Sequence, residues 1–61
     1  MGEVVLLSRR KAGYDTDRFF FEYKGKKIAR FYGSRLTAEQ AKNLFLVEVQ
    51  QGRIRDFQNL L

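Results

Sequence analysis

Two aromatic segments separated by two residues constrain the fold of this chain more than any other feature. RFFFEYK at residues 18–24 and KIARFY at residues 27–32 are rich in the aromatic and β-branched residues that strands favour. Gly25 and Lys26 lie between them, and Gly at the first central position is typical of the type II′ turn of a tight hairpin. The sequence therefore predicts an antiparallel β-hairpin over residues 18–32.

The predicted turn also decides which residues of the hairpin share a face. A two-residue loop at Gly25 and Lys26 places Phe20 opposite Phe31, and side chains alternate between the faces along each strand. One face is mainly apolar and is expected to meet the core: Phe19, Phe21, Tyr23, Ile28, Arg30 and Tyr32. The other face is mixed and basic, and it is expected to stay open to solvent or to a partner: Phe20, Glu22, Lys24, Lys27, Ala29 and Phe31.

The remaining sequence predicts one more strand and one helix. EVVLLSRR at residues 3–10 is rich in aliphatic residues and suits a first strand, and the Gly and Asp content of residues 11–17 predicts a loop. Thr37 and Gln40 have the spacing of a capping box, and Gly52 suits the position just after a helix, which predicts a helix over Ala38–Gln50. Its expected apolar stripe, flanked by Leu44 and Leu46, is Ala38, Ala41, Phe45 and Val49.

These elements predict an α+β fold: a three-stranded antiparallel β-sheet packed against one C-terminal α-helix, in the order β-β-β-α, with a short C-terminal tail. The length of 61 residues predicts one small domain over residues 1–61, and its stability is expected to be marginal because such a chain buries only about 60% of its unfolded surface. The sequence has no cysteine and no histidine, so neither a disulfide nor a zinc site of the usual kind can brace it. Apolar packing, or a partner, must hold the domain together.

The composition also argues against several classes of function. No apolar run approaches the roughly 20 residues of a membrane span, and we expect a cytoplasmic chain, or a nuclear one in a eukaryote. Ser8 and Ser34 have no obvious base and no Gly-rich phosphate loop is present, so we expect neither an enzyme nor a cofactor. Asp15 and Asp17 have no further acidic neighbours, so turn formation and strand capping explain them better than a metal site.

The net charge of +5 is concentrated in the first half of the chain. Residues 1–35 contain nine Lys and Arg against four Asp and Glu, whereas residues 36–61 contain three of each. A one-sided positive field attracts polyanions, of which nucleic acid is the commonest. The basic residues form two clusters, each of which is either a phosphate-contacting group or an ordinary solvated chain segment: Arg9, Arg10 and Lys11, and Lys24, Lys26 and Lys27.

The junction between the last strand and the helix resembles that of the AP2 family of DNA-binding domains. In FYGSRLTAEQA, residues 31–41, an aromatic residue and a Gly close the strand, and Thr-Ala-Glu opens the helix after the family's spacing. The segment Ile54–Phe57 is also similar to the closing segment of that family. The arm-binding domains of phage and transposon tyrosine integrases share this fold with looser sequences, and Ala29 and Arg35 depart from the plant-type pattern toward that branch.

The resemblance implies a sheet that enters the major groove of DNA. The contacts that it carries over by position are Glu22, Lys24 and Phe31, with Arg9 and Arg10 on a basic first strand. A role in transcription regulation, or in the arm-binding part of an integrase of phage or mobile-element origin, would follow. Together with the charge clusters, this predicts a double-stranded DNA-binding site made of Arg9, Arg10, Lys11, Phe20, Glu22, Lys24, Lys26, Lys27 and Phe31.

Two other partners remain open at this point. The chain also fits a small protein-interaction module, such as a phage-type inhibitor or adaptor, that binds an acidic protein through its basic half. Val47 points away from the predicted stripe, and with the tail it would offer a surface for self-association or for a protein partner. RNA fits the charge as well as DNA does. The aromatic pair Phe20 and Phe31 would contact bases in one case, and stabilise the hairpin or an interface in the other.

Overall fold

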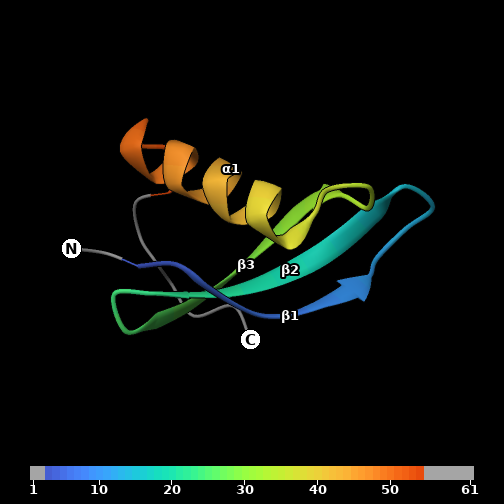
Figure 1. The fold of residues 1–61 in the computed structure, drawn as a ribbon, viewed down its shortest axis with the longest axis horizontal. Coiled ribbons are helices and arrows are strands. Elements are labelled where there is room, and N and C mark those ends of the chain that lie inside the picture. The colour runs from blue at the N-terminus through green and yellow to red at the C-terminus, as the bar shows by residue number, and fades with distance from the viewer. Residues whose placement is uncertain (1–2, 55–61) are drawn as a thin grey trace.

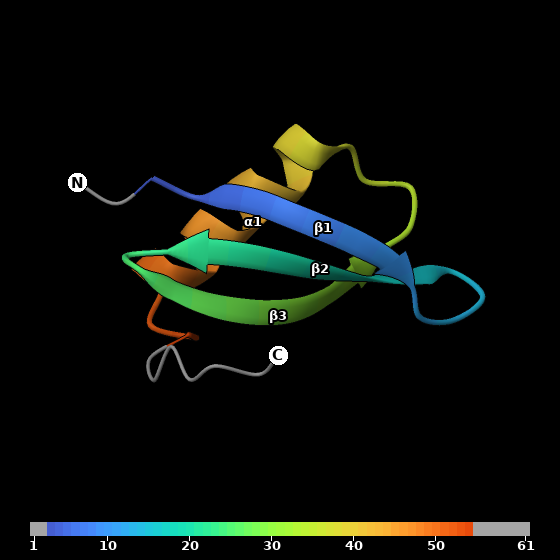
Figure 2. The same cartoon turned by 90° about the horizontal axis from the view of Figure 1, so that it is seen from below.

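The computed structural model describes residues 3–54, which form a three-stranded antiparallel sheet followed by one helix. The strands are β1 (Val5–Lys11), β2 (Thr16–Tyr23) and β3 (Lys26–Gly33), with β2 in the centre, and the helix is α1 (Ala38–Gln50). Helix α1 lies across one face of the sheet (Figure 1), and the view from below shows the strands with the helix behind them (Figure 2). The predicted α+β fold is confirmed; the predicted tail beyond Ile54 lies outside the described residues.

The hairpin of β2 and β3 differs from the predicted one in its turn. The turn residues are Lys24 and Gly25, with φ values of 52° and 76°, so the turn is of type I′ and not a type II′ turn at Gly25 and Lys26. Phe20 therefore pairs with Ala29, and Phe31 pairs with Arg18, instead of the two aromatics facing each other. The shift is by two positions, so every strand residue keeps its predicted face.

Strand β1 carries a bulge that rearranges its basic end. Leu6 pairs with Phe21 and Ser8 pairs with Phe20, so Leu7 is the additional residue. Because a bulge changes the alternation of side chains beyond it, Arg9 pairs with Phe19 on the helix side of the sheet, and Arg10 falls on the opposite side. The bulge also interrupts the regular edge of β1, which opposes pairing with other chains.

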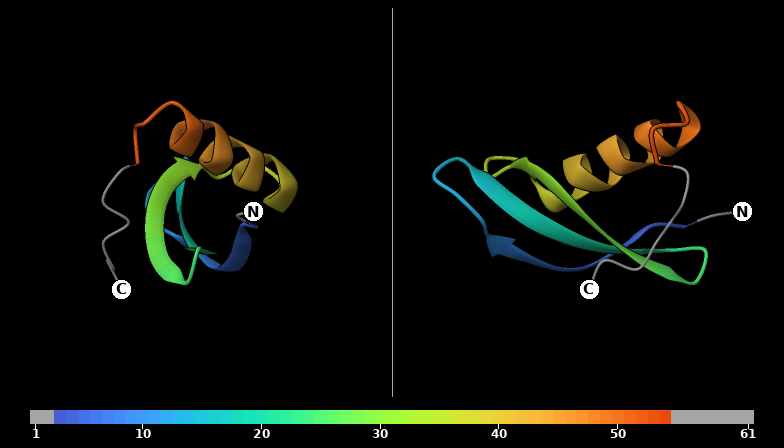
Figure 3. Two further views of the ribbon diagram at one scale, coloured as in Figure 1. Left: turned by 90° about the vertical axis from the view of Figure 1, so that its left-hand side faces the viewer. Right: turned by 180° about the vertical axis from the view of Figure 1, so that it is seen from behind.

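The core lies between the sheet and α1 and is mainly aromatic. Phe19, Phe21 and Phe45 are fully buried, and the ring centroids of Phe21 and Phe45 are 4.6 Å apart. The ring of Tyr23 meets Phe45 edge-on at 5.8 Å. Figure 3 shows from two further directions that α1 stays on one side of the twisted sheet. The face predicted to be apolar is thus the one that forms the core.

The ends of α1 follow the sequence signals. Thr37 accepts a hydrogen bond from the Gln40 backbone N–H, and the Gln40 side chain accepts one from the Thr37 N–H, which completes the capping box. At the other end, Gly52 has a φ of 78°, and the backbone N–H groups of Gly52 and Arg53 donate to the carbonyls of Val49 and Glu48. This is a Schellman motif, in which Gly accepts the left-handed conformation at little cost.

The buried face of α1 differs from the predicted stripe at two positions. Ala41 and Phe45 are buried as predicted, but Ala38 is exposed because it lies in the first turn, beyond the part of the helix that covers the sheet. Glu48 is buried instead, where its Oε1 accepts a hydrogen bond of 2.6 Å from the Tyr32 hydroxyl. The same oxygen lies 3.2 Å from Nη2 of Arg30, which explains how Arg30 is accommodated on the core face.

Candidate nucleic-acid interface

The sheet face opposite α1, called the outer face below, carries the charged and aromatic side chains that the core excludes. No helix or strand among residues 3–54 covers this face (Figure 2). The strand pairing assigns to it Val5, Ser8, Arg10, Arg18, Phe20, Glu22, Lys27, Ala29 and Phe31. Three cations and one carboxylate share it with two aromatic rings, a composition suited to a partner that is both anionic and partly apolar.

Arg18 is at the centre of the aromatic part of the outer face. Its guanidinium carbon lies 5.0 Å from the centroid of the Phe20 ring and 5.7 Å from that of Phe31. Distances of this size are typical of cation–π contacts, which fix the ring and the guanidinium relative to each other. Phe20 is half-buried, whereas Phe31 remains 62% exposed. The three side chains thus form a pre-ordered unit with one accessible ring.

Cations surround this unit along the outer face. Arg10 pairs with Arg18 across β1 and β2, and Lys27 pairs with Glu22 across β2 and β3. Arg10 and Lys27 are both exposed, and Glu22 is half-buried. Arg10 and Lys27 are therefore accessible to an anionic partner.

Two arginines on the helix side of the sheet are engaged by carboxylates. Nη2 of Arg9 forms a salt bridge of 3.0 Å with Asp17 Oδ2, and Nη1 donates to the carbonyl oxygen of Leu36 at 3.0 Å. Its guanidinium also lies 4.4 Å from the centroid of the Phe19 ring. Arg30 is paired with Glu48. Both strand arginines on the helix side of the sheet are therefore held in ion pairs.

The predicted site residues are brought together only in part. The outer face unites Arg10, Phe20, Glu22, Lys27 and Phe31. The predicted site also included Arg9, which the structure places on the helix side, where it ties β1 to the segment before α1. Lys24 lies in the turn, with its Nζ 5.4 Å from the ring of Tyr23, and Lys26 begins β3 beside it. Lys11 is the last residue of β1, at the opposite end of the sheet.

Arg18 is the residue of this face that was not singled out from the sequence. Its spacing of two residues from Phe20 in a strand already implies a shared face. What the sequence could not supply was the true turn, because only the turn at Lys24 and Gly25 brings Arg18 opposite Phe31. The sequence of β2 thus shows that Arg18 and Phe20 share a face, but the contact between Arg18 and Phe31 depends on the hairpin register.

The acidic residues of the first loop serve the fold. Asp17 binds Arg9, and the backbone carbonyl of Asp15 accepts a hydrogen bond from the Ser34 N–H at 2.9 Å. Within residues 3–54, no three acidic, His or Cys side chains form a group that could hold a metal ion. Among the same residues, no helix has the length and apolar content to cross a membrane.

No protein-family model, no curated protein and no solved structure matches this chain. The order of three antiparallel strands and one helix is consistent with an AP2-like fold.

Proposed function

We propose that this chain is a DNA-binding domain whose outer sheet face enters the major groove of double-stranded DNA. The observation that carries the proposal is the set of exposed cations and the exposed aromatic ring on the outer face. Arg9 and Arg30 are held in ion pairs on the helix side, whereas Arg10 and Lys27 are exposed on the outer face together with the exposed ring of Phe31. A face that carries exposed cations, and that no helix or strand of residues 3–54 covers, suits phosphate contacts, and the major groove is wide enough for β-strands.

The resemblance to the AP2 and integrase arm-binding domains supports this mode of binding. Its junction residues occupy the expected places, since Gly33 ends β3 and Thr37 caps α1. Phe31 and Glu22, which the resemblance implies as contact residues, both lie on the outer face. A phage or mobile-element protein, an integrase arm-binding domain or a transcription regulator would each use such a domain.

A second candidate function follows from an apolar patch on the helix. Leu44 is 37% exposed and Val47 is 43% exposed, and residues three apart on a helix are neighbours. A protein-interaction module that binds an acidic partner would use this patch, or a second copy of the chain would cover it. In that case the outer face would not need to discriminate between duplex DNA and other polyanions.

A salt titration with duplex DNA tests the proposed function. For a protein that neutralises several phosphates, the logarithm of affinity falls linearly with that of the salt concentration, by about 0.9 per phosphate. We expect the double variant Arg10→Ala/Lys27→Ala to weaken binding and to reduce the slope by about 0.9 for each phosphate that is no longer neutralised. The measurement is fluorescence anisotropy of a labelled duplex of about 20 base pairs, long enough to span the sheet, at several salt concentrations.

The matched control removes the same charge from the helix half. Lys42 lies 3.6 Å from Glu39 on α1, and Arg53 is exposed after the helix. Lys42→Ala/Arg53→Ala should leave the slope unchanged, because neither side chain belongs to the outer face. An equal reduction of slope in both double variants would show a general effect of net charge. Absence of binding to any duplex at low salt would favour the protein-interaction module.

A further inference from the structure

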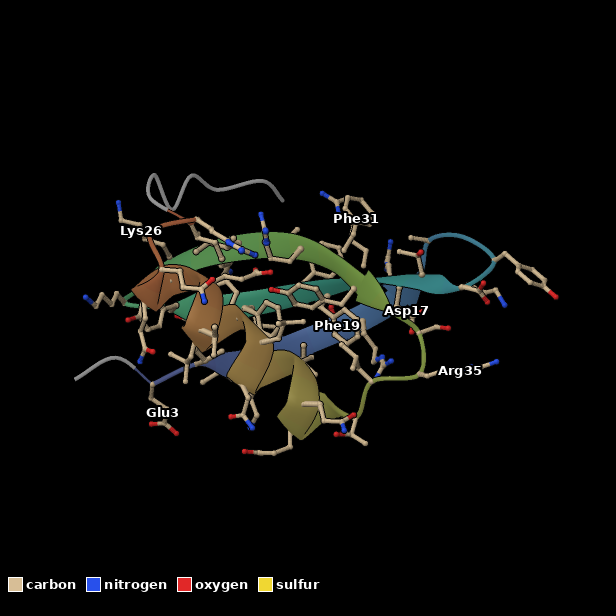
Figure 4. The ribbon with its side chains drawn as sticks, turned by 90° about the horizontal axis from the view of Figure 1, so that it is seen from above. Glu3, Asp17, Phe19, Lys26, Phe31 and Arg35 are labelled. Carbon is tan, nitrogen blue, oxygen red and sulfur yellow. The ribbon has the colours of Figure 1, made fainter. Side chains whose placement is uncertain are left out.

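The ring of Phe31 is an exposed apolar group on a face that is expected to contact phosphates. It is 62% exposed, and it projects from β3 on the outside, whereas Phe19 lies in the layer beneath the helix (Figure 4). Its cross-strand neighbour is Arg18, and Arg10 lies beyond Arg18 on β1; such cations suit anionic oxygens, whereas an aromatic ring has no charged donor to offer phosphate. A large apolar side chain held in this position needs an apolar contact on the partner.

The major groove of DNA exposes one strongly apolar feature, the C5-methyl group of thymine. We infer that the ring of Phe31 recognises thymine through this methyl group, so that the outer face distinguishes thymine from bases that lack it. This inference rests on the proposed function and makes it more specific. Phosphate contacts position a protein on the duplex but carry no sequence information, so the ring would provide the discrimination.

The geometry around the ring suits such a contact. Arg18 lies 5.7 Å from the Phe31 centroid and holds the ring by a cation–π contact, so little freedom is lost on binding. The aliphatic side chain of Val5 on β1 is 46% exposed and adds apolar surface to the same face.

Uracil differs from thymine only by the missing methyl group, so comparing duplexes that contain one or the other measures the methyl contact alone. A random duplex library is selected on the immobilised protein, and the selected duplex is synthesised with thymine or with uracil throughout. For the parent protein we expect the uracil form to bind about fourfold more weakly for each methyl group buried by the ring. Phe31→Ala should bind the two forms equally, and its salt slope should match the parent's because no charge is removed.

Tyr14→Ala is the matched control. Tyr14 is also an exposed aromatic, at 92%, but it lies in the loop between β1 and β2 and not on the outer face. This variant should keep the preference of the parent for thymine. Equal binding of both duplexes by the parent, or an undiminished preference in Phe31→Ala, would overturn the inference and leave the proposed function standing. Failure to select any duplex would overturn both.

Discussion

Replacing Phe45 with Ala is expected to remove a large part of the free energy of unfolding of the domain. Phe45 is fully buried at the centre of α1, with its ring centroid 4.6 Å from that of Phe21 and 5.8 Å from that of Tyr23. Removing a buried Phe side chain costs about 3–5 kcal/mol, because its apolar packing disappears and a cavity remains. The aromatic neighbours come from the sheet, so the substitution separates the two layers of the fold.

The small size of the domain makes this cost a large fraction of its stability. At roughly 0.05–0.15 kcal/mol per residue, a chain of 61 residues has a free energy of unfolding of about 3–9 kcal/mol. Urea denaturation followed by circular dichroism measures the change. Leu44→Ala is the control, since it removes an apolar side chain from the same helix at a position that is 37% exposed. A midpoint for Phe45→Ala close to that of the Leu44 variant would show that α1 packs through another face.

The second large effect is expected at Glu48. Glu48→Ala removes the acceptor of the 2.6 Å hydrogen bond from the Tyr32 hydroxyl and the ionic partner of Arg30. Burial and the hydrogen bond to Glu48 raise the pKa of the Tyr32 hydroxyl above its ordinary value, so this group stays a donor and needs its acceptor. A buried donor without a partner costs about 1–3 kcal/mol. The Arg30 side chain is 36% exposed, so water compensates for most of the missing ion pair.

A double-mutant cycle isolates this hydrogen bond. Tyr32→Phe and Glu48→Ala each break this hydrogen bond. The loss in free energy of unfolding of the double variant, measured by urea denaturation, should therefore be smaller than the sum of the losses of the two single variants. Glu48→Gln is the conservative variant: its amide oxygen still accepts from Tyr32, and only the charge opposite Arg30 is removed. It should therefore be less destabilised than Glu48→Ala. Additive costs in the cycle would show that the hydrogen bond between Tyr32 and Glu48 contributes little to stability.

The sequence predicted most of the fold because its signals were local. The aromatic segments of β2 and β3, the capping box at Thr37 and the Gly at position 52 each act within a few residues. The turn was misplaced because Gly25 fits the first central position of a type II′ turn as well as the second of a type I′ turn. Both turns give the same two faces, so the division between core and outer face did not depend on the choice.

The predicted site was less accurate because it depends on contacts between distant residues. The bulge at Leu7 places Arg9 on the helix side and Arg10 on the outer face. The residue pattern of β1 does not predict this bulge. Glu48 was not expected in the core, because its burial depends on Tyr32 and Arg30 of β3. Arg18 is brought opposite Phe31 only by the observed register.

The most direct test of the proposed binding mode is to map the surface of the protein that contacts DNA. Duplex DNA is added to the ¹⁵N-labelled protein, and chemical-shift changes in its NMR spectra are followed residue by residue. Binding through the outer face predicts that the largest changes occur at Arg10, Arg18, Phe20, Lys27 and Phe31, while residues of α1 such as Glu39, Lys42 and Gln50 change little. Changes concentrated on α1, with the outer face unaffected, would contradict it.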